Sequence, residues 1–277
     1  MRKQRTEDGL TLHLRDWPAA RPRARLLLVH GLGEHSGRYD RLARELAAAG
    51  IAVRGYDQRG HGRSEGGRGR LGRCGDALVR DLAGVFARYR EEGDGLPFLL
   101  GHSMGGLVAA YAVCAGGLRP RGLVLSAPAL ASHATRAQRV LATVAARSWP
   151  GLTLSNGLPL DWLSHAPQAA PEYAEDPLNH DRISARLADF IFRAGPGVIA
   201  AAPGLPVPTL LQVAGADRLV DPAGARAFAA AAPAARLTVH EYPELYHEIY
   251  NEAEPARRQV IDDLLAWLDR RIVAPGG

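Results

Sequence analysis

Short runs of β-branched and leucine residues alternate along much of the chain with longer segments whose apolar residues recur at helical spacing. The short runs cover residues 26–29, 51–56, 97–100, 122–126, 208–213 and 236–241. The helical segments cover residues 39–49, 76–89, 104–115, 223–232 and 256–272. Because strands that alternate with helices usually form a parallel sheet covered on both faces, this pattern predicts an α/β fold. We expect the opening pair, 10–17 and 25–29, to add an antiparallel lead-in.

The alternation stops between the runs at 122–126 and 208–213. Seven prolines lie between positions 150 and 203, and residues 128–205 are predicted to contain helical pieces such as 137–147 and 184–193. Since proline interrupts both helices and central strands, these residues do not continue the regular pattern. We therefore predict a helical cap over residues 128–205, inserted into a core formed by residues 1–127 and 206–277.

The composition is that of a folded globular protein. The 277-residue chain is 47% hydrophobic and 23% charged, values that argue against a disordered or fibrous chain. Its net charge of +5 would normally suggest an acidic partner. Only Lys3 of the 34 basic residues is a lysine, however, and the arginines are scattered among acidic residues. We therefore expect no nucleic-acid partner.

Two stretches bear on the location of the protein. Residues 95–118 carry no charged side chain, but Pro97 and several glycines interrupt them, so they predict a buried strand, a turn and a helix instead of a membrane span. The first residues include Glu7 and Asp8 and no apolar core of a signal peptide. With only two cysteines there is no disulfide framework. We expect a soluble, cytoplasmic protein, and the sequence makes no prediction of its oligomeric state.

Residues 101–105 read Gly-His-Ser-Met-Gly, a G-x-S-x-G pentapeptide centred on Ser103. The pentapeptide follows the apolar run 97–100 directly and precedes the helical segment 104–115. In such a setting a sharp turn between strand and helix exposes the serine above the sheet as a nucleophile. The alternative is an ordinary strand-to-helix turn that happens to contain a serine.

A nucleophilic serine needs a base, and the base needs an acid that orients it. In this architecture both follow the serine along the chain, on loops after later strands. Asp217 follows the run 208–213 and is the predicted acid, whereas Asp221 precedes a proline and is better suited to cap a helix. His247 lies in the loop beyond the run 236–241 and is the predicted base. His240 falls inside that run, where a structural role is expected.

Acyl transfer also needs hydrogen-bond donors for the developing oxyanion. The backbone N–H of Met104, directly after the nucleophile, is one such donor in this architecture. The second is expected from the loop at 30–33, His-Gly-Leu-Gly, whose glycines allow the backbone to present the amide of Leu32. A turn with no catalytic part would have a similar sequence.

No metal or other cofactor is expected. His30 and His35 have no acid or cysteine cluster beside them at ligand spacing. Residues 247–251 read His-Glu-Ile-Tyr-Asn and lack the second histidine of the zinc-binding H-E-x-x-H pattern.

Several stretches together resemble the α/β-hydrolase superfamily, and within it the monoacylglycerol lipase/lysophospholipase branch that is grouped with serine aminopeptidase-like hydrolases. The matching stretches are HGLGEHSGRYDRLA (30–43), DQRGHGRSEGGRG (57–69), GHSMGG (101–106), SNGLPLDWLS (155–164), GADRLVD (215–221) and YHEIYNE (246–252). They cover nearly the whole chain in the family's order. The resemblance implies a capped serine hydrolase that cleaves monoacyl lipids or similar esters without metal or cofactor.

The resemblance also implies residues that contact the substrate. Glu34 and Arg38 match positions that line the polar end of the site, near the glycerol group. Tyr250 stands where animal members of the family place a histidine, three residues after the catalytic one. In the cap, Trp162 and Leu163 are among the apolar residues that either line an acyl-chain pocket or form the cap's own core.

Three functions remain open at this point. The first is hydrolysis of carboxylic esters, most of all of monoacylglycerol or lysophospholipid type, through an acyl-enzyme on Ser103. The second is acyl transfer or peptide hydrolysis by the same triad. The third is a non-catalytic protein of hydrolase fold that binds an apolar ligand. The expected partner is a small lipid or ester substrate, with transient contact between the cap and a membrane surface.

Overall fold

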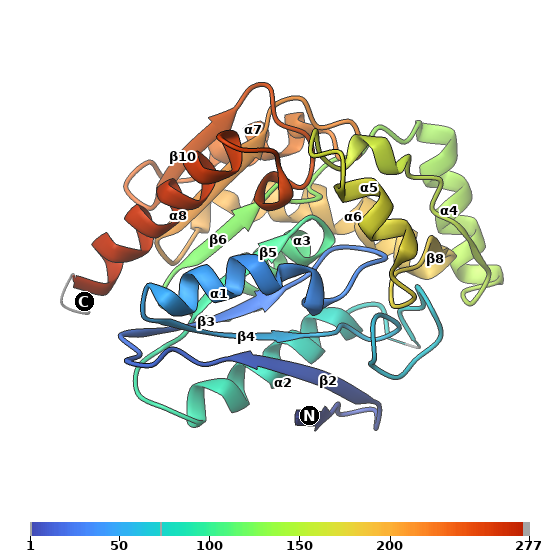
Figure 1. The fold of residues 1–277 in the computed structure, drawn as a ribbon. Helices are drawn as coiled ribbons and strands as arrows, with labels where there is room; N and C mark the ends of the chain where they lie inside the picture. The colour runs from blue at the N-terminus through green and yellow to red at the C-terminus, as the bar shows by residue number, and fades with distance from the viewer. Residues whose placement is uncertain (1, 73, 274–277) are drawn as a thin grey trace.

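The computed structural model describes residues 2–72 and 74–273, and its centre is an eight-stranded sheet (Figure 1). In spatial order the strands are β1 (Arg2–Arg5), β2 (Thr11–Trp17), β4 (Ile51–Tyr56), β3 (Ala24–Val29), β5 (Phe98–His102), β6 (Leu123–Ser126), β9 (Thr209–Ala214) and β10 (Leu237–Tyr242). The β1–β2 and β2–β4 pairs are antiparallel, and every other pair is parallel. The predicted α/β fold with a mostly parallel sheet is confirmed.

The antiparallel lead-in is built differently from the expectation. β2 does not pair with β3 but lies between β1 and β4, with Leu14 opposite Tyr56. Residues 18–23 between β2 and β3 include Pro18 and Pro22 and no glycine, which disfavours the tight turn of a hairpin. The chain instead places β3 two positions away from β2 in the sheet, and β4 later fills the position between them.

Helices cover both faces of the sheet (Figure 1). α1 (Asp40–Ala48) and α8 (Ala256–Val273) share one apolar cluster with the sheet, and α2 (Ala77–Glu91), α3 (Met104–Cys114) and α7 (Pro222–Ala231) share the other. Side chains of β3 alternate between them, because Leu26 and Leu28 belong to the first cluster and Leu27 and Val29 to the second. No helix in the described part of the chain is both long enough and apolar enough to cross a membrane.

Residues between β6 and β9 form the segment predicted as a cap. It contains α4 (Arg136–Ser148), β7 (Thr153–Ser155), α5 (Ala169–Glu175), β8 (Arg182–Ser184) and α6 (Ala185–Ala201). The predicted helices at 137–147 and 184–193 correspond to α4 and α6, while α5 and the β7–β8 pair were not predicted. Short turns of 3-10 helix complete the fold: η1 (Ser36–Tyr39), η2 (Leu160–Trp162), η3 (Ala202–Gly204) and η4 (Ile249–Asn251).

Part of the cap segment shares the core of the sheet. Leu187, Phe190 and Val198 of α6 belong to the same apolar cluster as α2 and α3. The division of the chain into a core (1–127 and 206–277) and an inserted cap (128–205) therefore stays a prediction.

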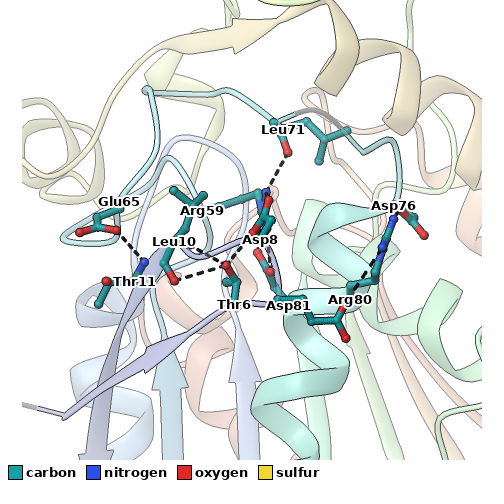
Figure 2. A network of polar contacts seen from close by, with 12 residues as sticks. Thr6, Asp8, Leu10, Thr11, Arg59, Glu65, Leu71, Asp76, Arg80 and Asp81 are labelled. Atoms are coloured by element: carbon teal, nitrogen blue, oxygen red, sulfur yellow. Dashed lines mark hydrogen bonds and ion pairs between the residues drawn. The ribbon is translucent and has the colours of Figure 1, made fainter.

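A buried arginine holds the glycine-rich loop after β4 in place (Figure 2). The guanidinium of Arg59 donates two hydrogen bonds of 2.6 and 2.8 Å to Asp81 on α2 and two of 2.9 and 3.0 Å to Asp8 before β2. Arg59 also contacts the carbonyl oxygen of Leu71 at the far end of the loop. The hydrogen bond from Arg59 is the main cause that lowers the pKa of Asp8 to about 2. The network ties three segments that are distant in sequence to one another.

Candidate active site

Ser103 lies in the sharp turn between β5 and α3 with φ = 53° and ψ = −121°, a left-handed conformation that costs energy for a residue with a side chain. The turn is held by the N–H of Ser103, which donates to the carbonyl of Ser126 at 3.0 Å. Its flanking glycines are required by close packing. A Cβ on Gly101 would come within 2.4 Å of the Gly105 carbonyl oxygen, and one on Gly105 within 2.3 Å of the Val29 carbonyl oxygen.

The predicted acid and base meet at the end of the sheet. Asp217 follows β9 and His247 follows β10, and Oδ2 of Asp217 lies 2.6 Å from Nδ1 of His247. The other carboxylate oxygen, Oδ1, accepts the N–H groups of Leu219 and Val220 at 2.8 and 2.9 Å. Both side chains are less than one-tenth exposed. This contact fixes the imidazole so that Nε2 is left to face other groups.

The pKa values of the two groups move apart as a catalytic pair requires. Burial raises the pKa of Asp217, but the charge and hydrogen bond of His247 and two backbone N–H groups outweigh it, so the pKa lies below its usual value. Burial lowers the pKa of His247, and the charge and hydrogen bond of Asp217 outweigh that effect, so its pKa lies above its usual value. Asp217 therefore stays ionised while His247 is made a stronger base.

The rejected candidates have the structural roles that were expected for them. Asp221 is the N-cap of α7, where its Oδ1 accepts the N–H of Ala223 at 2.9 Å. His240 lies on β10 with Nδ1 3.5 Å from Asp263. Neither residue lines the cavity beside Ser103.

The loop at 30–33 packs directly against the nucleophile. A Cβ on Gly31 would lie 3.1 Å from Cβ of Ser103. The N–H of Gly31 donates to Oε1 of Glu34, and the hydroxyl of Tyr39 donates to the same oxygen at 2.7 Å. Glu34 therefore anchors the loop whose Leu32 amide is the predicted oxyanion donor. Leu32 lines the cavity beside Ser103.

Glu34 belongs to a buried ionic cluster with Arg38 and Glu248. Arg38 makes a bidentate pair with Glu248, at 2.5 and 2.9 Å, and approaches Glu34 only to 3.5 Å. Burial raises the pKa of Glu34 above its usual value, because Arg38 compensates it only in part. For Glu248 burial acts in the same direction, but the bidentate Arg38 outweighs it and lowers the pKa. Glu34 and Glu248 line the cavity beside Ser103, whereas Arg38 does not.

Tyr250 is not brought to the cavity. It is 3% exposed, and its hydroxyl donates to Oε1 of Gln212 inside the core. Gln212 in turn donates to the hydroxyl of Tyr242 at 2.9 Å. The turn η4 therefore points Tyr250 at the buried side of β9, where its phenol satisfies a buried amide and does not line either hollow beside Ser103.

Two connected hollows meet at Ser103 and His247, which line both of them. We call the first, of about 380 Å³, the polar arm. Its lining includes polar side chains that the sequence did not single out: Asn156, Asp176, Asn179, His180 and Asp181. The second, of about 590 Å³, is the apolar arm. Its lining includes Met104, Trp162, Ile183, Ile191 and Phe192.

Trp162 and Leu163 therefore lie at different arms. Trp162 lines the apolar arm, and Leu163 lines the polar arm. The carbonyl oxygen of Leu163 accepts the N–H of Glu248 at 2.7 Å, so the cap segment touches the loop that carries His247. Among the described residues, no group of three or more histidine, cysteine, aspartate or glutamate side chains is arranged to hold a metal ion.

A strained serine at a strand-to-helix turn, with an Asp–His pair after later strands of a mostly parallel sheet, defines the class of serine hydrolases with the α/β-hydrolase fold. Comparison with known proteins gives the family. Residues 20–254 match the family described as "Serine aminopeptidase, S33", and the chain belongs to it.

The relatives are similar over nearly the whole chain. A monoacylglycerol lipase from Mycolicibacterium smegmatis is 34% identical over 262 residues, covering 91% of this chain and 90% of that protein. The human monoglyceride lipase is 33% identical over 277 residues, covering 97% and 90%. The chain also spans 28% of the length of an uncharacterised abhydrolase domain-containing protein from Dictyostelium discoideum, with 31% identity over 273 residues.

The solved structures agree with this placement. The crystal structure of a monoacylglycerol lipase from Paleococcus ferrophilus is 34% identical, covers 94% of this chain and 99% of its own, and superposes with a TM-score of 0.86. The predicted membership of the monoacylglycerol lipase-like branch of the α/β-hydrolases is confirmed, and the chain is a carboxylic-ester hydrolase.

Proposed function

We propose that the protein hydrolyses monoacylglycerol or similar monoacyl esters by a Ser103–His247–Asp217 triad. The observation that carries the proposal is the 2.6 Å contact between Asp217 and His247, with His247 and the strained Ser103 lining the same two arms. Nε2 of His247 takes the hydroxyl proton of Ser103 as its oxygen attacks the ester carbonyl carbon. Asp217 keeps the imidazole in the tautomer that can accept this proton.

The N–H groups of Leu32 and Met104 hold the negative oxygen of the tetrahedral intermediate. When the intermediate collapses, the alcohol leaves with the proton that His247 had taken, and an acyl-enzyme on Ser103 remains. Water then repeats the sequence and releases the acid. Glu34 supports this step indirectly, because its bond to the N–H of Gly31 fixes the loop that presents Leu32.

The two arms suit the two halves of a monoacyl ester. The apolar arm, walled by Trp162, Ile191 and Phe192, takes the acyl chain, since burial of each methylene is worth about 0.8 kcal/mol. The polar arm, with Glu34 and Asn179 among its lining residues, takes the alcohol portion. Arg38 contributes through Glu248 and not through contact with the alcohol.

The experiment that tests the proposal measures release of fatty acid and glycerol from a monoacylglycerol by the wild-type protein and by Ser103→Ala. We expect both products from the wild type and a loss of many orders of magnitude in the variant. Addition of a second alcohol and of a peptide amide in parallel reactions detects acyl transfer and peptide hydrolysis. Equal rates for wild type and variant would exclude the triad, and failure to label with a fluorophosphonate would favour a non-catalytic binding protein.

We also propose that the cap segment touches a lipid surface. Seven large apolar residues between positions 140 and 158 are exposed in the described structure, including Leu141 and Trp149 at 67% and 66%. Apolar side chains gathered in this way on one segment mark an interaction surface. Sedimentation with phosphatidylcholine vesicles tests this. We expect the wild type to pellet with the vesicles and Leu141→Ser to pellet less. Equal amounts of wild-type protein in the pellet with and without vesicles would contradict the proposal.

A further inference from the structure

The polar arm has an unusual charge. Four carboxylates line it, from Glu34, Asp176, Asp181 and Glu248, and none of its lining residues in the described chain is a lysine or an arginine. Since the arm opens on Ser103 and His247, whatever occupies it lies beside the reacting atoms. The charge of this lining therefore acts on the alcohol portion of a bound ester.

One arginine compensates part of the charge of two of the four carboxylates. Arg38 makes a bidentate pair with Glu248 and lies 3.5 Å from Glu34. Glu34 is 4% exposed, and burial shifts its pKa upward. Because they share one guanidinium, Glu34 and Glu248 together contribute at most one net negative charge to the arm.

No arginine or lysine is paired with Asp176 or Asp181 in the described structure. Asp176 accepts the N–H of Leu178 and contacts Nε2 of His35. Nδ1 of His35 accepts the N–H of Gly37, so Nε2 is the ring atom left to donate to Asp176. Asp181 is exposed at the edge of the arm. These two carboxylates therefore give the lining of the arm a net negative charge.

The histidines that line the arm add no positive charge beside the triad, and the two nearest arginines, Arg38 and Arg68, act on its lining without being part of it. Burial is the main cause that lowers the pKa of His102 to about 3 and that of His180 to about 4, so both line the arm as neutral rings at neutral pH. Arg68, which is close enough to act on His180, donates to the carbonyl of Gly62 at 2.7 Å and does not line the arm.

We propose that the polar arm selects the alcohol portion of the ester by charge. Among esters of one acyl chain, an alcohol that carries an ammonium group is hydrolysed fastest, a neutral alcohol more slowly, and an alcohol that carries a phosphate or sulfonate slowest. The proposal rests on the proposed function, and it adds amine-bearing alcohols to the substrate class while it disfavours phosphate-bearing ones. A unit charge on the alcohol, 4 Å from one carboxylate in water-like surroundings, should change kcat/KM about fivefold, and the change should be larger where water is excluded.

The test compares three butyrate esters of matched size: the choline ester, the neutral 3,3-dimethylbutyl ester and the anionic 2-sulfoethyl ester. We expect kcat/KM to fall at least fivefold at each step in that order at low salt, and the differences to shrink in 1 M NaCl, where the screening length is about 3 Å. Asp181→Asn keeps the shape of the side chain and should lower the choline-to-dimethylbutyl ratio about fivefold. Glu175→Gln, on α5 outside the arm, is the matched control and should leave the ratio unchanged.

Equal kcat/KM for the three esters, an order that favours the anion, or a ratio unchanged in Asp181→Asn would overturn the charge selection. These outcomes differ from a failure of the proposed function. If the wild type hydrolyses the neutral ester no faster than Ser103→Ala, the triad is wrong. If the neutral ester is hydrolysed by the triad without an order by charge, only the present inference is wrong.

Discussion

Asp217→Asn separates the catalytic role of the carboxylate from its role in the fold. An asparagine has nearly the same shape, and its carbonyl oxygen can still accept the N–H groups of Leu219 and Val220, which now bond to Oδ1 at 2.8 and 2.9 Å. The amide NH₂ then takes the place of Oδ2 and points at Nδ1 of His247. Because that group donates, Nδ1 must accept, and the ring proton moves to Nε2.

An imidazole protonated at Nε2 cannot take the proton of Ser103. We therefore expect kcat for a soluble ester to fall about 10⁴-fold, which corresponds to about 5 kcal/mol of lost transition-state stabilisation. The fold should lose much less. One buried hydrogen bond to a charged group is worth about 1.5–3 kcal/mol, so the thermal midpoint should fall by only a few degrees.

The assay measures kcat by ester hydrolysis and the midpoint by circular dichroism on the same preparations. Asp221→Asn is the matched control, because Asp221 caps α7 and asparagine is an equally good N-cap. We expect it to keep wild-type kcat within about twofold, as surface caps do not act on the reacting atoms. A variant Asp217→Asn that keeps more than a tenth of wild-type kcat would refute the tautomer argument.

Three further outcomes follow from the geometry. Gly105→Ala places a Cβ 2.3 Å from the carbonyl oxygen of Val29, so we expect at least about 1–3 kcal/mol of destabilisation, measured by denaturant unfolding. The raised pKa of His247 means that activity, which needs the neutral base, should decline as pH falls through a midpoint above that of an ordinary histidine; a pH profile of kcat/KM with a lower midpoint would contradict this. Arg59→Met leaves the buried carboxylate of Asp81 unpaired and should lower the free energy of unfolding by about 3–5 kcal/mol, measured by thermal unfolding. A loss as small as that of an exposed surface ion pair would contradict this.

Local sequence was enough to predict the nucleophile turn. The apolar run before Ser103, the small residues around it and the helical segment after it are contiguous in the chain, and they specify a strand, a tight turn and a helix without help from distant residues. The pairing of Asp217 with His247 was predictable for a related reason. Both follow parallel strands, and the carboxyl ends of adjacent parallel strands lie at the same edge of a sheet.

The rest depends on contacts between segments that are far apart in the chain. No local signal places β4 between β2 and β3, because the order of strands depends on pairings between segments that are distant in sequence. The position of the cap loops is set by bonds such as that from the N–H of His180 to the carbonyl of Gly33, at 2.8 Å. These bonds bring Asp176 and Asp181 to the polar arm, and their sequence neighbours give no indication of it.

The direction of the Tyr250 side chain could not be predicted from the sequence. The resemblance to the family implied a substrate contact at this position, but the phenol reaches the buried amide of Gln212, and that bond draws the side chain into the core. The sequence shows which residue stands there, whereas the direction of its side chain depends on a partner 38 residues away.

In the proposed mechanism Ser103 is the nucleophile, and His247, oriented by Asp217, activates it. Mass spectrometry of the protein after reaction with a fluorophosphonate ester, followed by peptide mapping, tests this assignment. We expect a single adduct on the peptide that contains Ser103, absent in Ser103→Ala and formed much more slowly in Asp217→Asn. An adduct on another residue, or an equal rate of labelling in Asp217→Asn, would contradict it.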